Sequence, residues 1–278
     1  MLQLVLGLST RHRRTRMPFR IRAFGMTDVG RARQKNEDNF IILPEENIFV
    51  VADGMGGHAS GQLASAIAVA KISEFLCIER HKQGFKWPYS VQKERSWDGN
   101  SLACAIQHAN ERIFIEQCKD PAHEGMGTTI ASMLQKHGED TFVLGHVGDS
   151  RIYRYRRDGL YQMTEDHSLL NHLLTTGQIS PEDADNFARK NVIFRALGLK
   201  NEVVVEISEL SMQNEDIYLM CSDGLTDLVE DWVIAEVISN CGSNLNTACD
   251  TLIRMANHNG GTDNITIVML YLEEIGRV

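Results

Sequence analysis

The segment NIFVVADGMGGH, residues 47–58, is an apolar run that ends in Asp53-Gly54 and continues into a glycine-rich turn. An Asp-Gly pair is a common hairpin signal. Two other pairs need no further explanation, because Asp98-Gly99 lies in a polar loop and Asp158-Gly159 lies between two strand-like runs. Asp53-Gly54 differs because a strand leads into it and helix-forming sequence follows. We therefore interpret Asp53 as a functional residue at the end of a strand.

Acidic residues occupy the same kind of position elsewhere in the chain. They flank apolar, strand-like runs: Asp149 follows 141–148, Asp223-Gly224 follows 216–222, Asp263 precedes 264–272, and Asn36-Glu37-Asp38 precedes 40–43. A single carboxylate is costly to bury without a partner. If these strands share one sheet system, the acids converge, and converging carboxylates require a cation. Hard oxygen ligands favour Mg²⁺ or Mn²⁺.

The order of strand and helix signals favours an α+β fold. The signals occur in blocks, which argues against a parallel doubly wound sheet. Helices are predicted from Ser60, from a cap at Ser101, at 166–176, from Ser180-Pro181, and at 230–239 and 245–258. Further strands are predicted at 128–134, 141–147, 151–156, 160–163, 203–207 and 217–221. Residues 79–100 are polar and without a clear period, and we interpret them as a loop.

One domain is predicted over residues 21–274, because the sequence has no internal repeat and no low-complexity linker. Residues 1–20 are predicted to be a disordered or loosely held extension. Its apolar start, Met1–Leu8, precedes the basic stretch Arg11–Arg16, whereas a signal peptide places its positive charge first. No segment approaches the roughly 18–20 apolar residues of a membrane span.

Composition narrows the function classes. The chain has 278 residues, 43% of them hydrophobic, which is enough for a full core. The net charge of −9 argues against nucleic acid as the main partner, because binding a phosphate backbone requires clustered Lys and Arg. Six scattered cysteines without a CxxC pair indicate reduced, packed thiols. We therefore expect a reducing, cytoplasmic location.

Several polar residues allow two interpretations from the sequence alone. Arg33 could hold two oxygens of a phosphate with its planar guanidinium, or it could form a surface ion pair. Asp149 could belong to a site or to a turn closed by a salt bridge. His58 follows the glycine turn and could face the site. His146 lies within a strand and is expected to be packed, and His167 is expected to neighbour a helix cap.

Six motifs, in this order, resemble those of the metal-dependent protein phosphatase family, PP2C type, in its bacterial form. They are RQKNED (33–38), VADGMGGH (51–58), GTT (127–129), GDSR (148–151), CSDGL (221–225) and GTDNI (261–265), and they span nearly the whole chain. The resemblance implies a four-layer αββα sandwich, in which two antiparallel sheets pack face to face between helices. It also implies metals in a cleft at one end of the sandwich, where the strand-end acids are expected.

The resemblance further implies hydrolysis of phosphoserine and phosphothreonine in proteins, by a water that two Mn²⁺ or Mg²⁺ ions activate. The roles that it implies are as follows: Asp53 bridges the metals, Asp223 and Asp263 complete one metal site, Glu37 and the Gly54 carbonyl serve the other, Asp38 holds metal-bound waters, and Arg33 grips the phosphate. Glycine at position 54 would let the backbone approach the ion with no Cβ in the way. The thiol of Cys221 would be a bystander, because the water attacks directly.

The resemblance also bears on a third metal, a flap and the general acid. The resemblance implies a third, more weakly held metal at Asp149 and a mobile flap over residues 166–195. Animal relatives carry a histidine after the Asp-Gly pair, proposed as the general acid for the leaving alcohol. Met55 stands at that position here. His58 or a metal-bound water could take over that role, and the sequence leaves the choice open.

Rival functions use similar residues. A two-metal nuclease or phosphodiesterase would need comparable acids, but the acidic charge and the lack of a basic groove signal count against it. A catalytically weak module that binds phosphoproteins would be expected to have lost metal ligands, and the motifs retain them all. The expected partners are phosphorylated proteins, including a Ser/Thr kinase and its substrates, and the expected state is a monomer. The sequence does not choose between kinase antagonism and regulation of a secretion system.

Overall fold

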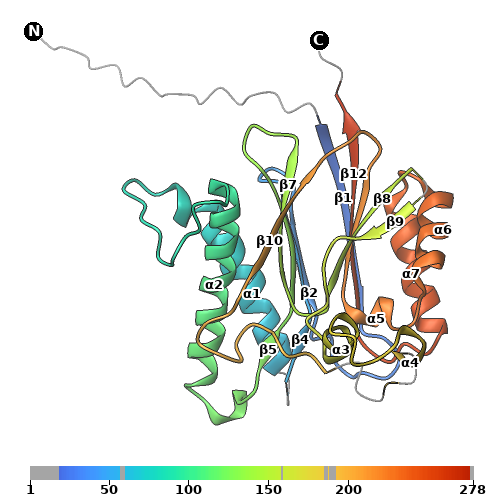
Figure 1. The fold of residues 1–278 in the computed structure, drawn as a ribbon, viewed down its shortest axis with the longest axis horizontal. Helices are drawn as coiled ribbons and strands as arrows, with labels where there is room; N and C mark the ends of the chain where they lie inside the picture. The colour runs from blue at the N-terminus through green and yellow to red at the C-terminus, as the bar shows by residue number, and fades with distance from the viewer. Residues whose placement is uncertain (1–18, 57–59, 158, 185–186, 188–191, 276–278) are drawn as a thin grey trace, which may run out of the picture.

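Two five-stranded antiparallel sheets pack face to face in the structure, a computed structural model that describes residues 19–56, 60–157, 159–184, 187 and 192–275 (Figure 1). Sheet A has the order β1 (Phe19–Asp28), β12 (Ile265–Glu274), β11 (Ile217–Cys221), β8 (Arg151–Arg156) and β9 (Gly159–Gln162). Sheet B has the order β10 (Glu206–Ser211), β7 (Thr141–Val147), β6 (Ile130–Gln135), β3 (Ile48–Ala52) and β2 (Asn39–Leu43). A small third sheet pairs β4 (Gly54–Met55) with β5 (Gly127–Thr128).

Helices cover the outer face of each sheet (Figure 1). Sheet B is covered by α1 (Ser60–Cys77) and α2 (Trp97–Gln117), and sheet A by α5 (Asp223–Thr226), α6 (Asp231–Cys241) and α7 (Leu245–His258). The remaining short helices are η1 (Glu79–His81), η2 (Pro121–His123), α3 (Leu169–Thr175) and α4 (Pro181–Ala184). The layers therefore run helix, sheet, sheet, helix, and the α+β sandwich predicted from the sequence is confirmed.

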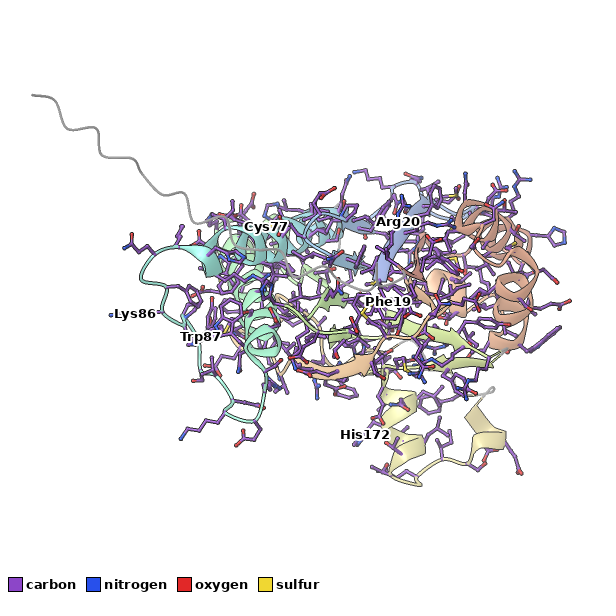
Figure 2. The ribbon with its side chains drawn as sticks, turned by 90° about the horizontal axis from the view of Figure 1, so that it is seen from above. Phe19, Arg20, Cys77, Lys86, Trp87 and His172 are labelled. Carbon is purple, nitrogen blue, oxygen red and sulfur yellow. The ribbon has the colours of Figure 1, made fainter. Side chains whose placement is uncertain are left out.

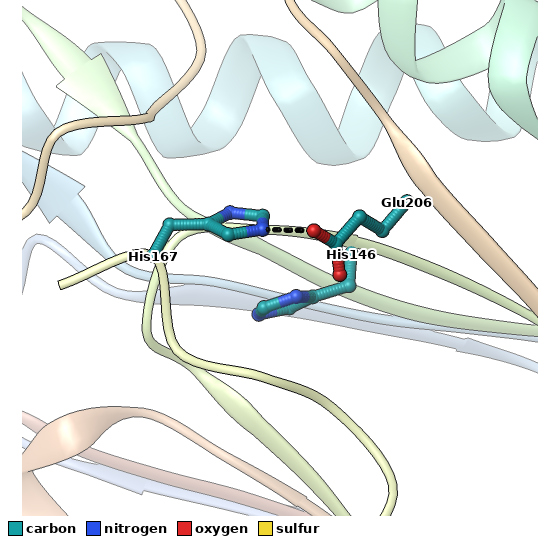
Figure 3. A group of neighbouring side chains, drawn as sticks. All are labelled: His146, His167 and Glu206. Carbon is teal, nitrogen blue, oxygen red and sulfur yellow. Dashed lines mark hydrogen bonds and ion pairs between the residues drawn. The ribbon is translucent and has the colours of Figure 1, made fainter. Parts of the chain in front are cut away.

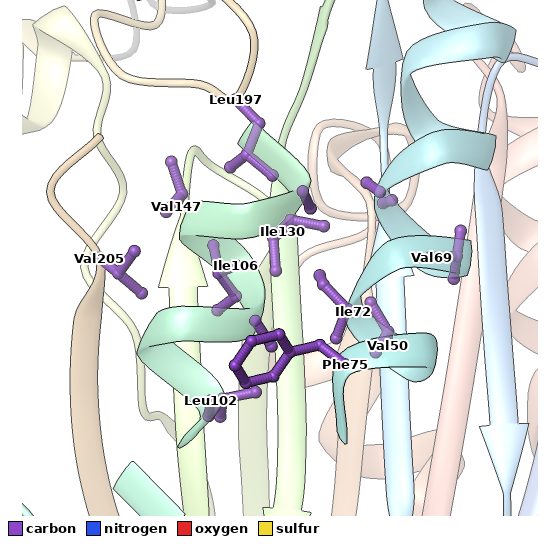
Figure 4. Close-up of a cluster of buried hydrophobic side chains, with 14 of the residues drawn as sticks. Val50, Val69, Ile72, Phe75, Leu102, Ile106, Ile130, Val147, Leu197 and Val205 are labelled. Carbon is purple, nitrogen blue, oxygen red and sulfur yellow. The ribbon is translucent and has the colours of Figure 1, made fainter. Parts of the chain in front are cut away.

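Three hydrophobic cores fill the spaces between the four layers. In β3, Ile48 and Val50 face α1 and α2, as part of the cluster in Figure 4, whereas Phe49 and Val51 face sheet A. The central strand β12 divides in the same way, since Ile267 joins the core beneath α6 and α7 and the next residue joins the core between the sheets. Successive side chains of a strand point to opposite faces, so a central strand of this sandwich must be apolar at every position.

The strand pairing brings the motif-bearing strand ends to one end of the sandwich. In sheet B, Asn39 at the start of β2 pairs with Ala52 at the end of β3, and Ile130 at the start of β6 pairs with Val147 at the end of β7. In sheet A, the end of β11 pairs with the start of β12. Each candidate acid lies one or two residues beyond one of these ends. The antiparallel registers therefore gather residues that are far apart in the sequence.

The start of α2 differs from the prediction. We expected Ser101 to cap this helix, but α2 begins at Trp97, and the side chain of Ser96 accepts a hydrogen bond from Gly99 N–H. Ser101 lies inside the helix and donates to the Trp97 carbonyl. Asp98 is therefore not a turn residue, because its carboxylate forms a buried ion pair with Arg80 (3.1 Å). This tertiary contact overrides the local turn signal of Asp98-Gly99.

Two strands differ from the prediction by more than two residues at either end. The strand predicted at 203–207 is found at Glu206–Ser211. β1 was not predicted, and it begins at Phe19, so Phe19 and Arg20 belong to sheet A although the sequence analysis placed them in the N-terminal extension. The rest of that extension lies outside the described residues.

Residues 60–81 are the one helical stretch in the described part of the chain that is long and apolar enough to cross a membrane on length and composition alone. This stretch contains α1. Ala64, Ala68 and Ile72 of α1 are fully buried in the core against sheet B, so α1 has the features of a core helix.

Candidate active site

Asp53 leaves the end of β3 on a backbone that threonines hold from two sides. Its N–H donates to Thr129 Oγ1 (3.1 Å), and its carbonyl accepts hydrogen bonds from Thr128 Oγ1 (2.8 Å) and Thr129 N–H (2.9 Å). Both threonines are buried at the junction of β5 and β6. The GTT motif thus fixes the direction in which the Asp53 carboxylate leaves the sheet.

Gly54 lies where three segments of backbone meet. A Cβ on Gly54 would lie 2.2 Å from the Gly61 carbonyl oxygen and 2.5 Å from the Glu37 carbonyl oxygen. A Cβ on Gly61 would in turn lie 2.7 Å from Glu37 Oε2. The first turn of α1 therefore packs directly on the chain after Asp53. From the sequence we expected this glycine to allow the approach of an ion, and the structure supplies a steric reason that holds without an ion.

Gly54→Ala is expected to destabilise the fold by on the order of 1–3 kcal/mol, because the added methyl group overlaps backbone that has no free space to move into. The drop in melting temperature measures this effect. Gly99→Ala is the matched control, since Gly99 lies in α2 and the three atoms nearest to its added Cβ would all belong to side chains, the first being Ser96 Oγ at 3.1 Å. Equal melting temperatures for Gly54→Ala and the wild type would contradict the packing described here.

Asn264 joins the Glu37-Asp38 segment to the start of β12. Its side-chain oxygen accepts from Glu37 N–H (2.8 Å), and its amide nitrogen donates to the carbonyls of Val29 (2.9 Å) and Lys35 (3.0 Å). The side chain is buried, with 4% of its surface exposed. One amide therefore orders both ends of the segment that carries Arg33 and Glu37.

Asp223 and Asp263 meet because their strands are neighbours in sheet A. Asp223 opens α5 directly after β11, and Asp263 precedes β12. The two turns touch at Gly224, where a Cβ would lie 2.0 Å from the Asn264 carbonyl oxygen and 3.5 Å from Asp263 Cβ. Ser222 completes the junction, since its hydroxyl donates to Asp38 Oδ2 (2.8 Å) and accepts from Thr266 N–H (2.9 Å).

The charges of this acid cluster (Glu37, Asp38, Asp53, Asp149, Asp223 and Asp263) act on one another. Burial raises the pKa of Asp53 well above its ordinary value, and the charges of Asp38, Asp223, Asp149 and Asp263 raise it further. Burial also raises the pKa of Asp223, followed by the charge of Asp149. Asp53 therefore lies close enough to Asp38 and Asp223 to be affected by both charges, and without a cation the carboxylates repel one another.

Two oxygens in the cluster have no protein partner. Asp38 Oδ1 and Asp223 Oδ1 are buried and make no hydrogen bond within the described part of the chain. A buried carboxylate oxygen without a partner carries a large desolvation penalty. Divalent cations would remove both the repulsion and this penalty, and an all-oxygen donor set fits Mg²⁺ or Mn²⁺. The residues present therefore fit a metal centre.

Arg33 lies at the exposed edge of the acid cluster. Its guanidinium forms an ion pair with Asp263 Oδ2 (2.7 Å), and 54% of the Arg33 side chain is exposed. Its pKa is raised by the hydrogen bond to Asp263, against a smaller opposing effect of burial. Arg33 therefore does form an ion pair, one of the two roles that its sequence position allowed. Its partner, Asp263, is a candidate metal ligand. The guanidinium is held beside the cluster and open to solvent.

Asp149 lies on the flap side of the cluster. Burial, then the charge of Asp166, raises the pKa of Asp149 to about 6. The neighbouring Arg151 pairs with Asp166, through Nε to both oxygens (3.0 Å each) and through Nη2 to Oδ2 (2.7 Å). The salt bridge considered for this turn therefore runs to the flap, and the Asp149 carboxylate is left facing the other acids.

His146, His167 and Glu206 form a second group whose ligand atoms all lie within 4.8 Å of one another (Figure 3). Gly148 N–H donates to His167 Nδ1 (2.9 Å), so the proton of this imidazole is on Nε2, which lies 2.7 Å from Glu206 Oε1. A metal at Nε2 would require that proton to leave. Arg195 Nη1, 2.9 Å from the same nitrogen, adds a positive charge. We interpret His167 and Glu206 as a hydrogen-bonded brace, against which the ring of His146 packs at 4.8 Å between ring centroids.

The brace holds the turn before Asp149. His167 N–H donates back to the Gly148 carbonyl (2.8 Å), which closes a two-point clamp on a glycine with φ +112°. Burial, followed by the charge of His167, lowers the pKa of His146 to about 4, so His146 is neutral. Its 2% exposure confirms that it is packed. Ser168 caps α3, so His167 neighbours a helix cap as predicted.

Two further residues considered for the site are His58 and Cys221. His58 lies outside the described residues. Cys221 is fully buried at the end of β11, and burial raises the pKa of its thiol to about 12. A thiol in that state is a poor nucleophile, because the thiolate is the reactive form.

Sequence reasoning missed the residues that link the motifs, above all Asn264, Ser222 and Thr129. Each lies inside or beside a motif that the sequence analysis quoted, so its position was visible. The partner of each side chain could not be read from the sequence, since the hydrogen bonds described above join residues 44 to 235 positions apart. A buried polar side chain next to a strand-end acid is the signal that could have identified them.

The family model described as Protein phosphatase 2C matches residues 30–258. The chain is 37% identical to the serine/threonine phosphatase stp of Listeria innocua, over 88% of this chain and 93% of the relative. It is 32% identical to the protein phosphatase PhpP of Streptococcus pneumoniae, over 90% of this chain and 96% of the relative.

Solved structures agree with the sequence comparisons. The Mycobacterium tuberculosis serine/threonine phosphatase PstP/Ppp superposes with a TM-score of 0.79 at 32% identity, over 91% of this chain and 99% of its own. The catalytic domain of the serine/threonine protein phosphatase PstP in complex with two manganese ions superposes with a TM-score of 0.77 at 30% identity, over 92% and 99%.

Proposed function

The chain belongs to the protein phosphatase 2C family of serine/threonine phosphatases, and we propose that it hydrolyses phosphoserine and phosphothreonine in proteins at a binuclear metal centre held by its acid cluster. The observation that carries this proposal is the convergence of three acids: the charges of Asp38 and Asp223 raise the pKa of Asp53, and each of these two has a buried oxygen without a hydrogen-bond partner among the described residues. The manganese-bound relative supports two ions.

Ligand roles are assigned to the residues that converge. Asp53 would bridge two ions, Asp223 and Asp263 would complete one site, Glu37 and the Gly54 carbonyl would serve the other, and Asp149 would hold a third, looser ion. When bound, Mn²⁺ or Mg²⁺ would lower the pKa of a water between them and make it nucleophilic at neutral pH. The two metals are chemically similar for this donor set.

The side chains around the metal centre orient water and substrate. Asp38 is fixed through Oδ2 by Ser222, which leaves its buried Oδ1 to accept a hydrogen bond from the attacking water. Arg33, exposed beside Asp263, can turn two N–H groups toward the equatorial oxygens of a phosphate. The leaving alkoxide needs a proton, and His58 and a water remain the two candidate donors.

The alternative function, a catalytically weak module that binds phosphoproteins, explains less. It would not require the mutually repelling carboxylates that the chain retains, since these lower the stability of the protein in the absence of a cation. We further propose that the enzyme acts as a cytoplasmic monomer. Because its bacterial relatives are named as protein phosphatases, we also propose that it opposes a Ser/Thr kinase.

Chelation tests this function directly. Hydrolysis of a phosphothreonine peptide is expected to fall to background in EDTA and to return when Mn²⁺ is added in excess, because the nucleophile depends on the cations. Release of inorganic phosphate measures both steps. A zinc chelator too weak to remove Mn²⁺ or Mg²⁺ is the control. Turnover that survives complete removal of divalent ions would contradict the proposal.

A further inference from the structure

The chain between α1 and α2, residues 78–96, folds as an ordered lobe against both helices. Arg80 and Asp98 anchor its ends with an ion pair whose side chains are only 9% and 7% exposed. The side chain of Asn100 accepts from Gln92 N–H and donates to the Gln92 carbonyl, both at 2.9 Å. Phe85 stacks edge-to-face on Phe75 of α1. The lobe is therefore held in one arrangement, and any cavity beneath it is preformed.

A cavity of about 450 Å³ lies between this lobe, the C-terminal half of α1 and the middle of α2. Its apolar wall is formed by the rings of Phe75 and Phe85, with His108 of α2 packed against Phe75 at 6.0 Å between ring centroids. The cavity shares no residue with the acid cluster. Figure 2 shows Lys86 and Trp87 of the lobe at the left edge of the molecule, apart from His172 of α3, which lies at the bottom of the view.

Four cations from three separate segments line this cavity. They are Lys71 of α1, Lys82 and Lys86 of the lobe, and Arg112 of α2. Lys71 and Lys82 form ion pairs with Glu74 and Glu79, both at 2.6 Å.

Lys86 and Arg112 have no hydrogen-bond or ion-pair partner among the described residues, and both are exposed. The charge of Arg112 reaches His108, where it lowers the imidazole pKa together with the larger effect of burial. The lining thus carries four positive and two negative side chains in a chain whose net charge is −9. This local excess of positive charge favours an anionic ligand over a neutral or cationic one.

We propose that this cavity, the lobe pocket, binds a phosphate group carried by a phosphorylated protein. The pocket does not hydrolyse this phosphate, and its ligand belongs to the same class as the substrate of the active site. Two unpaired cations can each donate to a phosphate oxygen, and the ring wall suits the short carbon stem of phosphoserine or phosphothreonine. This inference rests on the proposed function for the identity of the partner.

The phosphate held in the lobe pocket is a different one from the phosphate that is hydrolysed. Gly61 at the start of α1 touches Glu37 and Gly54, whereas Lys71 lies ten residues further along the same helix. Ten residues correspond to about 15 Å along a helix axis. A single phosphate cannot reach both places, so the lobe pocket selects substrates or partners that carry a second phosphate.

The experiment is an NMR titration of the full chain loaded with diamagnetic Mg²⁺, which follows the His108 imidazole and the Trp87 indole. Trp87 reports on the pocket because its ring lies 5.1 Å from that of Phe85. The probe is a peptide with a non-hydrolysable phosphonate analogue of phosphothreonine, compared with inorganic phosphate. The test variant is Lys86→Gln with Arg112→Gln, and the matched control is Lys93→Gln with Lys200→Gln, two exposed lysines outside the pocket.

The peptide is expected to shift both signals, and the test variant is expected to bind it about tenfold more weakly at this site while the control binds normally. Absence of a shift, or a shift that persists unchanged in the test variant, would overturn the proposal. Equal affinity for inorganic phosphate and peptide would replace the protein partner with a free anion. Hydrolysis of a singly phosphorylated peptide is assayed in parallel, so that failure of the proposed function is seen separately.

Discussion

Asp223→Asn is expected to lower metal-dependent hydrolysis of a phosphothreonine peptide by about a thousandfold and, at the same time, to stabilise the metal-free protein. The loss of activity follows from the proposed ligand role, because an amide oxygen without a negative charge binds a divalent cation more weakly than a carboxylate. The gain in stability follows from the structure. The pKa of Asp223 is raised by burial and by the charges of Asp149, Asp227 and Asp263, so the carboxylate is itself a source of strain.

Opposite signs for activity and stability distinguish a ligand from a structural residue. A structural residue would lose both together when mutated, whereas a ligand in a repelling cluster loses activity and gains stability. We expect the melting temperature of metal-free Asp223→Asn to exceed that of the wild type by about 2–4 °C, which corresponds to on the order of 1 kcal/mol. Scanning calorimetry in EDTA measures it.

Asp250→Asn is the matched control for this experiment. Asp250 lies on α7, where it pairs with Arg254 on the helix surface. Its replacement should leave hydrolysis unchanged and should alter stability only slightly. If Asp223→Asn retained near-normal turnover, Asp223 would have to be removed from the proposed ligand set. If it melted below the wild type in EDTA, the repulsion argued here would be wrong.

The bounds of helices and strands were predicted best where a continuous apolar pattern lay between clear turn residues or caps. The bounds of β7, β8, β11 and α7 match the prediction, because their apolar patterns are continuous and their ends are marked by turn residues or caps. The strand-end acids were predicted for the same reason. An acid directly after a buried strand has to lie at the end of a sheet, whatever the order of the strands.

The sequence was least informative where a tertiary contact decided the local structure. β1 escaped notice because it is an edge strand of sheet A whose residues are half-buried or exposed, so its pattern is weak. The start of α2 was misplaced because the buried pair of Asp98 with Arg80 cannot be inferred from either residue alone. The same holds for Asn264, whose three partners come from a segment more than 200 positions away.

The pH dependence of stability should change sign when the cluster binds metal. Burial raises the pKa of Asp38 to about 6, and burial followed by the charge of Asp166 raises the pKa of Asp149 to about 6. An aspartate in the unfolded chain titrates near pH 3.9, at about its reference value. Between these values the folded, metal-free protein binds more protons than the unfolded chain, so its stability falls as the pH rises through this window.

Metal ions compete with those protons, since a carboxylate must be ionised to bind a cation. The rise in melting temperature produced by Mg²⁺ or Mn²⁺ is therefore expected to be small near pH 5 and to grow up to about pH 7. Calorimetric scans at intervals of half a pH unit, with EDTA and with each metal, measure stability against pH in the metal-free and the metal-bound protein.

Asp149→Asn separates the effect of the acid cluster from general acid unfolding. Subtracting the stability of the metal-free variant from that of the metal-free wild type at each pH leaves the contribution of the Asp149 carboxyl. That difference should favour the wild type least above pH 6. A difference that instead grows in favour of the wild type as the pH rises would mean that the fold stabilises Asp149 as an anion, and that the turn between β7 and β8 does not need a cation.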